Sequence, residues 1–436
     1  MTNCINSFSL VKTQTMVEKR DVKFYPILFV ISTLCVTPLR IFTYIQTLPN
    51  TFRLFFTFVA LASFFLGVIF SPRKVRTPLF TLFVASFAFC SINWYGQWRE
   101  SITYFEKMYA DYLFFLPVLL SVFYLSWDNI KIKKRVFGFV FVLECVTLIT
   151  TIYGLQIYPN ASRDLASEAA SIPIYKQMNI GGYDFIYGLV LLIPTLVFML
   201  GKKRHVVLLL PLFFSVLLCI FISQYSIALI ITIVSLSIFI LFKIQSKPLR
   251  FSLLFLALLL MLTLIGFSDI VFSSLGDFMY KVGADAIGKK LYDLASSLGS
   301  NLFVGTVESR LHQYSLSFTT IIKSPLFGRL INDSYRCGGH SELLDIWATG
   351  GVGALVLFTY ILKKCYSRFR QGGLNRKSIN YLNLTFFVFV FIALTNTVLN
   401  SPLIAINAFL LPSLIMEKSM PEDGNENTVD HECFVG

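Results

Sequence analysis

The sequence predicts an all-α, polytopic membrane helix bundle of about twelve transmembrane helices. The first observation is composition: 56% of the 436 residues are hydrophobic, 16% are aromatic and only 14% are charged. Ordinary soluble domains carry about 25% charged residues. The second is that uncharged apolar runs of about 20 residues, the length that crosses a bilayer, recur along the chain. The third is that these runs lack the alternating pattern of membrane β-strands, so they are predicted to be helices.

Hydropathy places twelve spans along one membrane domain, 1–436, with cytoplasmic tails at 1–23 and 417–436. The paired segments 206–242 and 380–416 are too long for one crossing, so each is predicted to form a tight hairpin. Their turns are expected at 223–226 and 396–402. The spans are 24–40, 53–70, 78–94, 111–127, 136–156, 183–200, 206–222, 225–242, 251–268, 343–362, 380–397 and 401–416.

The net charge of +13 is explained by membrane topology. With the N-terminus in the cytoplasm, the cytoplasmic segments hold 24 of the 37 Lys and Arg residues. The outer loops hold 13, of which seven lie in one long loop. Short cytoplasmic loops of membrane proteins are enriched in Lys and Arg. The distribution therefore indicates orientation, and it argues against a nucleic-acid partner.

Two outer loops are long, at 157–182 and at 269–342, the second between spans 9 and 10. The second loop contains helical patterns at about 276–298 and 307–323 and is expected to pack over the outer face of the bundle. On the helix at 307–323, one face carries Leu311, Phe318 and Ile322. An adjacent face carries Arg310, Tyr314 and Ser317, and His312 lies opposite Arg310. No internal repeat relates the two halves of the chain, which weakens a transporter interpretation.

The densest polar cluster runs from Arg336 to Glu342 and ends at Asp345, where the long loop re-enters the membrane. His340, beside a Gly-Gly turn, can accept a proton near neutral pH. An equally weighted alternative is a helix-entry turn in which Ser341 is only the N-cap.

Two further charged residues, Arg310 and Glu144, have side chains that could take part in chemistry. Arg310 suits bidentate contact with phosphate, although a lone Arg would more often bind solvent or lipid headgroups. Glu144, inside a span, is expected to face the protein interior, and a packing role is favoured over catalysis. Nucleotide-binding and metal-binding motifs are absent from the sequence, so neither a metal nor a cofactor is expected.

Several motifs together resemble the O-antigen ligase and polymerase superfamily. They are Arg310-x3-Tyr314, then Ser324-Pro325-Leu326-Phe327-Gly328, then Gly339-His340-Ser341-Glu342 with Asp345, then Gly350-Gly351-Val352-Gly353. The resemblance is close over about 306–360, and its His-Ser-x-x-x-Asp form looks more like the polymerases, commonly called Wzy, than the ligases.

The resemblance implies a fold like that of GT-C-type membrane glycosyltransferases and a periplasm-facing site in the bacterial inner membrane. The implied donor is an oligosaccharide on polyprenyl pyrophosphate, and a chain-length regulator protein is a further implied partner. His340 would be the base, with Glu342 second, and Arg310 would bind the pyrophosphate. Tyr314 and Asp345 would contact substrate.

One departure from the family affects this assignment. The family often has an Arg in the turn before the eighth span, where this chain reads Ser223-Gln224-Tyr225-Ser226. Another cation is therefore needed, and Arg336, Arg329 and Arg99 are the candidates. Ligation of finished polysaccharide to lipid A-core is the alternative activity, and a lipid-linked sugar flippase is the less favoured class.

Overall fold

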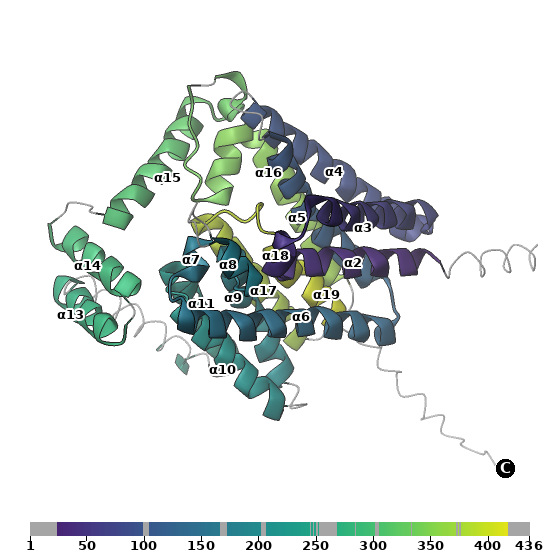
Figure 1. The fold of residues 1–436 in the computed structure, drawn as a ribbon. Coiled ribbons are helices and arrows are strands. Elements are labelled where there is room, and N and C mark those ends of the chain that lie inside the picture. The colour runs from purple at the N-terminus through teal and green to yellow at the C-terminus, as the bar shows by residue number, and fades with distance from the viewer. Residues whose placement is uncertain are drawn as a thin grey trace, which may run out of the picture.

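Helices make up the architecture of the described chain, and no strand occurs in it. The computed structural model describes residues 24–98, 104–165, 172–201, 206–244, 246, 248–249, 252, 268–283, 285–300, 305–332, 334–371, 374 and 376–416. Figure 1 shows the bundle at the right and the loop helices gathered at the left.

Among the described residues, eleven apolar stretches form the bundle, and they coincide with eleven of the predicted spans. Six helices in the described chain are long and apolar enough to cross a membrane. They are α3 (Asn50–Phe70), α4 (Arg73–Trp98), α6 (Ile130–Ile157), α9 (Tyr183–Gly201), α16 (Glu342–Arg370) and α17 (Arg376–Thr395). The other apolar stretches lie in α2 (Tyr25–Ile41), α5 (Tyr104–Ser126), α10 (Val206–Ile222), α11 (Ser226–Lys243) and the C-terminal run α18 (Pro402–Ala405), η3 (Ile406–Leu410) and α19 (Leu411–Ile415).

The prediction of an all-helical membrane bundle is confirmed in two respects: the described chain is helical, and several of its helices have the length and apolar character of membrane spans. Both long paired segments are interrupted where turns were expected, between α10 and α11 and between α17 and α18. The ninth predicted span, 251–268, lies almost wholly outside the described residues, so the count of twelve spans stays a prediction.

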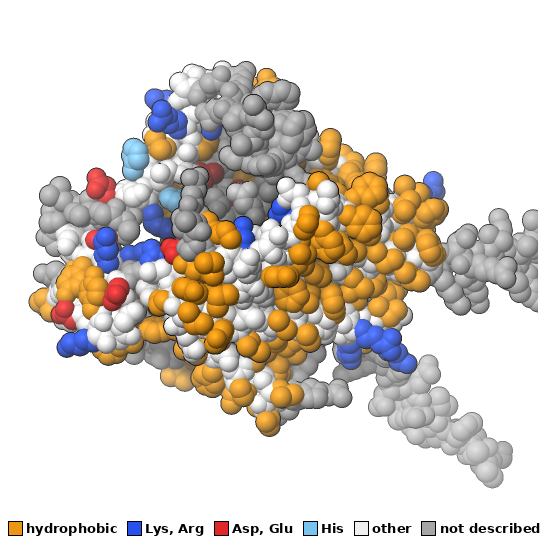
Figure 2. All heavy atoms as spheres, viewed as in Figure 1, with side chains coloured by type: hydrophobic (Ala, Val, Ile, Leu, Met, Phe, Trp, Pro, Cys, Tyr) orange, Lys and Arg blue, Asp and Glu red, His pale blue; other side chains and the backbone are white. Residues whose placement is uncertain are grey.

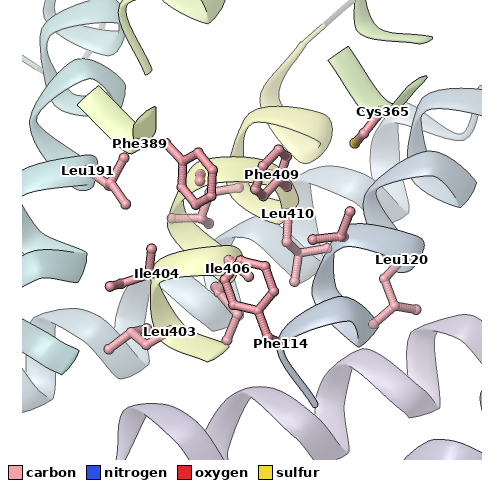
Figure 3. Close-up of a cluster of buried hydrophobic side chains, with 14 of the residues drawn as sticks. Phe114, Leu120, Leu191, Cys365, Phe389, Leu403, Ile404, Ile406, Phe409 and Leu410 are labelled. Carbon is pink, nitrogen blue, oxygen red and sulfur yellow. The ribbon is translucent and has the colours of Figure 1, made fainter. Parts of the chain in front are cut away.

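The core of the bundle centres on α5, α9, α17 and the C-terminal run, and the neighbouring bundle helices add buried side chains to it. In Figure 3 Phe114 of α5, Phe389 of α17 and Phe409 of η3 converge. The ring centroids of Phe389 and Phe409 are 5.1 Å apart, and those of Phe114 and Phe389 are 6.3 Å apart. Peripheral helices instead expose large apolar side chains such as Phe58 of α3, as expected for surfaces facing lipid (Figure 2).

The loop-bearing end holds η1 (Thr43–Thr47), α7 (Ala161–Asp164), α8 (Ile172–Gln177), α13 (Ser268–Lys281), α14 (Asp285–Ser300), α15 (Gly305–Lys323) and η2 (Gly328–Ile331). The prediction of a single helix at 276–298 is wrong, because the segment forms two helices, α13 and α14, with a turn between them. Gly283 adopts φ +79° at this break, a left-handed conformation that glycine accepts and that cannot continue a helix. The helix predicted at 307–323 is confirmed as α15.

Candidate functional site

The first turn of α16 anchors the polar cluster that the sequence singled out. Ser341 is the N-cap, and its Oγ accepts a hydrogen bond from the Leu344 amide at 3.5 Å. Asp345 returns the contact, because its Oδ2 accepts from the Ser341 amide at 3.1 Å. The capping role predicted for Ser341 is therefore present, and Asp345 is fixed one turn into the helix.

Helix α15 holds the preceding loop against α16 through two hydroxyl groups. Ser317 donates to Oδ1 of Asp345 and accepts from the Gly338 amide at 2.8 Å. Thr320 donates to the Arg336 carbonyl at 2.7 Å. These bonds position the segment that carries His340 between α15 and the start of α16.

The Pro-Leu-Phe-Gly turn locks onto a break in α16. Gly351 adopts φ +67° and ψ −169°, and a Cβ there would lie 2.0 Å from the Leu326 carbonyl oxygen. The helical hydrogen-bond pattern is interrupted at this point, and the Val352 amide donates to the Pro325 carbonyl at 3.0 Å. Trp347 Nε1 donates to the same carbonyl at 2.9 Å. The Pro-Leu-Phe-Gly turn and the glycine-rich break in α16 are therefore in direct contact, and we call this contact the seam.

The inner face of α15 contacts the end of α17. Arg310 Nη1 and the Tyr314 hydroxyl both donate to the Thr395 carbonyl, at 3.4 Å and 3.3 Å. Arg310, Tyr314 and Ser317 thus face inward together, as the helical wheel predicted, whereas His312 is exposed.

Glu342 holds the segment between α17 and α18. Its Oε2 accepts from the amides of Val398 and Leu399 at 2.7 Å and 3.0 Å, and its own amide donates to the Asn396 carbonyl at 3.2 Å. The side chain is buried. A carboxylate oxygen that accepts two amide hydrogen bonds has a positioning role, which makes Glu342 a weaker candidate for a base than His340.

His340 is a half-buried base with a cation beside it. Burial lowers the pKa of His340, the charge of Arg310 lowers it further, and the Asp345 carboxylate opposes both. The imidazole is therefore neutral at neutral pH and able to accept a proton.

A second basic group extends this positive region. Burial lowers the pKa of Lys290 to about 8, and the charges of Arg163 and Arg310 act in the same direction against the opposing carboxylate of Asp293. Arg163 comes from α7, Lys290 from α14 and Arg310 from α15. We call Arg163, Lys290, Arg310 and His340 the basic cluster. Figure 2 shows Lys, Arg and His side chains gathered at this end of the molecule.

The remaining predicted cations lie differently. Arg329, in η2, interacts with Cys337, and the Arg336 side chain is exposed. Arg99 lies outside the described residues. The structure therefore brings Arg310, Tyr314, His340, Glu342 and Asp345 to one place.

Sequence reasoning missed Lys290 and did not select Arg163 as a cation for the site. A signal was available, because short outer loops of membrane proteins are poor in Lys and Arg and an outer cation therefore invites an explanation. Arg163 lies in the shorter of the two outer loops, at 157–182.

No known family model matches this chain, and no curated protein does either. Among the described residues, no three His, Cys, Asp or Glu side chains are grouped as metal ligands would be.

Proposed function

We propose that this protein is a membrane glycosyltransferase that polymerises oligosaccharide repeat units carried on polyprenyl pyrophosphate. The observation that carries the proposal is the basic cluster, in which the charge of Arg310 acts on the neutral imidazole of His340 and the charges of Arg163 and Arg310 act on Lys290. A glycosyl transfer from a pyrophosphate donor needs a base for the attacking hydroxyl and positive charge for the leaving group.

In the proposed reaction, a sugar hydroxyl of the acceptor attacks the anomeric carbon of the donor. His340 accepts the hydroxyl proton as the new carbon–oxygen bond forms. The bond from the anomeric carbon to the pyrophosphate oxygen breaks, and polyprenyl pyrophosphate leaves with both electrons. The imidazolium then returns its proton to the leaving group or to water.

The cations stabilise the negative charge that develops on the pyrophosphate leaving group. Arg310 is anchored through one N–H to the Thr395 carbonyl, and a guanidinium has five donors in a planar fork suited to phosphate. The charges of Arg310 and Arg163 both act on Lys290. In this proposal, Lys290 and Arg163 supply the positive charge that was expected from an Arg before the eighth span. Asp345 steadies the imidazolium as it forms, since its carboxylate favours the charged ring.

The same proposal fixes the setting of the reaction. We place twelve spans in the bacterial inner membrane, with the loop-bearing end in the periplasm, in a bundle of the GT-C type. The charge sorting of the loops and the gathering of α7, α8 and α13–α15 at one end support this orientation (Figure 1). A chain-length regulator is a proposed partner.

The test is an electrophoretic gel of surface polysaccharide from cells with and without the gene. A polymerase predicts that deletion reduces the ladder to core plus one repeat. Loss of all attached repeats with accumulation of lipid-linked polymer would identify a ligase instead. An unchanged ladder contradicts both activities and returns a flippase to consideration.

The purified protein in vesicles gives a second test. With lipid-linked repeat units as sole substrate, it is expected to release one polyprenyl pyrophosphate for each bond formed. Failure to form any product from these units would contradict the proposed reaction.

A further inference from the structure

The outward surface of α15 is divided lengthwise into two strips. The apolar strip carries Leu311, Phe318 and Ile322, all exposed, with Phe318 at 57% and Ile322 at 65% of full exposure. The polar strip carries Glu308, His312, Thr319 and Lys323, also exposed. The third side of the helix, with Arg310 and Tyr314, faces the protein.

This arrangement reverses the usual placement of an amphipathic helix on a protein. Apolar strips normally pack on the core, and polar faces meet water. In α15 a polar face packs inward and the apolar strip has no protein cover among the described residues. Exposed apolar surface of this kind indicates contact with a membrane or a partner.

Exposed apolar side chains also follow α15 in the turn at 325–327 and on α16. Leu326 and Phe327, just beyond α15, are 62% and 52% exposed. The Pro325 carbonyl next to them accepts from the Val352 amide of α16. Val352 and Val356 are exposed on α16, which is one of the helices apolar enough to span a membrane. Exposed apolar side chains therefore occur on α16, on the turn that is hydrogen-bonded to it, and on α15.

We propose that the C-terminal half of α15 and the turn at 325–327 are inserted in the bilayer leaflet on the loop-bearing side, with lipid covering the apolar strip. Lipid is favoured over a protein partner because the strip adjoins exposed apolar side chains of α16, a helix long and apolar enough to cross a membrane. The strip of Thr319 and Lys323 then meets water at the interface, which is the arrangement of an interfacial amphipathic helix.

This placement has a consequence for Arg310, although it does not depend on the proposed reaction. Arg310 lies on the same helix, on the face turned from lipid to protein. An interfacial helix therefore holds the basic cluster near the depth of lipid headgroups, where the phosphate of any membrane lipid also lies.

Tryptophan fluorescence provides the test. The full-length F318W, I322W and T319W variants are reconstituted in phosphatidylcholine vesicles whose acyl chains are either brominated or plain. Brominated chains quench a tryptophan in the leaflet, and aqueous iodide quenches one in water. F318W and T319W form a matched pair, because the two positions are adjacent in α15 but lie on the apolar and the polar strip respectively.

The fluorescence added by F318W and I322W is expected to be quenched several-fold more by brominated lipid than that added by T319W, with the opposite order for iodide. Equal iodide quenching of F318W and T319W would overturn the proposal in favour of a water-exposed strip. Quenching of F318W by neither agent would overturn it in favour of a protein cover. L326W gives an independent measurement if F318W does not accumulate in the membrane.

Discussion

Two polar regions lie at the loop-bearing end of the molecule, and they are built on opposite principles. The first is centred on Asn179, whose side chain ties three segments together. Its Nδ2 donates to the hydroxyls of Thr147 and Thr150 at 3.1 Å and 3.2 Å, and its Oδ1 accepts from the Thr43 hydroxyl and the Tyr44 amide at 3.3 Å. Donors and acceptors are matched within the protein.

The basic cluster is the second region, and it brings like charges together. Arg163 and Arg310 both disfavour the charge on Lys290, and Arg310 disfavours protonation of His340. Such an arrangement costs folding free energy, and an anionic ligand would recover it. A matched polar region holds a fold, whereas a mismatched one of this kind is suited to binding.

The largest expected effect is on the reaction. Because His340 is the proposed base, His340→Ala is expected to lower glycosyl transfer by about 100-fold or more. The thermal stability of the purified protein should change little, since the ring is half-buried and outside the core. Turnover of lipid-linked repeat units in vesicles measures the first quantity, and a melting curve measures the second.

His312→Ala is the matched control for this variant. His312 lies on the exposed polar strip of α15, so its removal should leave turnover near that of the parent protein. Equal loss in both variants would contradict the assignment of the base to His340, because His312 lies on the outward side of α15.

Next in size is the effect of Asn179→Ala on stability. The change leaves buried partners without hydrogen bonds and puts alanine at φ +54°, so a loss of about 2–4 kcal/mol is expected. Chemical denaturation in detergent micelles measures it. Asn179→Gly keeps the backbone conformation and should lose less, while an unchanged midpoint in the alanine variant would contradict the role given to Asn179.

A smaller and opposite pair of effects is expected for Lys290→Gln. Turnover should fall about tenfold, because one of the cations proposed to stabilise the leaving group is removed. Stability should rise by up to about 1 kcal/mol, since a partly buried like charge is relieved. Lys289→Gln, at an exposed neighbouring position, should change neither quantity. A loss of stability in Lys290→Gln would contradict this prediction. It would show that the basic cluster stabilises the fold, as the hydrogen bonds of Asn179 do.

The smallest effect is on the pH profile. Burial and Arg310 lower the pKa of His340, so the neutral ring predominates down to a pH below about 6.5, the value of a free histidine. Turnover is expected to stay level near neutral pH and to fall as the pH drops through the lowered pKa, because the base becomes protonated. An acidic limb centred above about pH 6.5 would contradict the environment described for His340.

Periodicity and length in the sequence were sufficient to predict the bundle. The apolar runs gave eleven described stretches at their expected positions, and the wheel of α15 correctly grouped Arg310, Tyr314 and Ser317. Local rules of this kind act within one helix. They also predicted Ser341 as an N-cap.

Features that depend on contacts between distant segments were missed. Lys290 joins Arg163 and Arg310 only because α7, α14 and α15 meet in space. Glu342 was read as a possible base, yet its oxygen is engaged by amides 56 and 57 residues further along the chain. The break at Gly283 shows a different weakness, since an isolated glycine in a helical pattern can be tolerated or can end the helix.

The seam between Pro325 and the break at Gly351 limits how the site can open. The Val352 amide and the Trp347 indole of α16 both donate to the Pro325 carbonyl, so the turn after α15 is hydrogen-bonded to α16. Ser317 adds a second fastening through Asp345. Helix α15 and the turn that follows it are therefore held to α16 at two places. Under the proposed function, the growing polysaccharide would slide past a fixed helix, and α15 would not swing aside for each added unit.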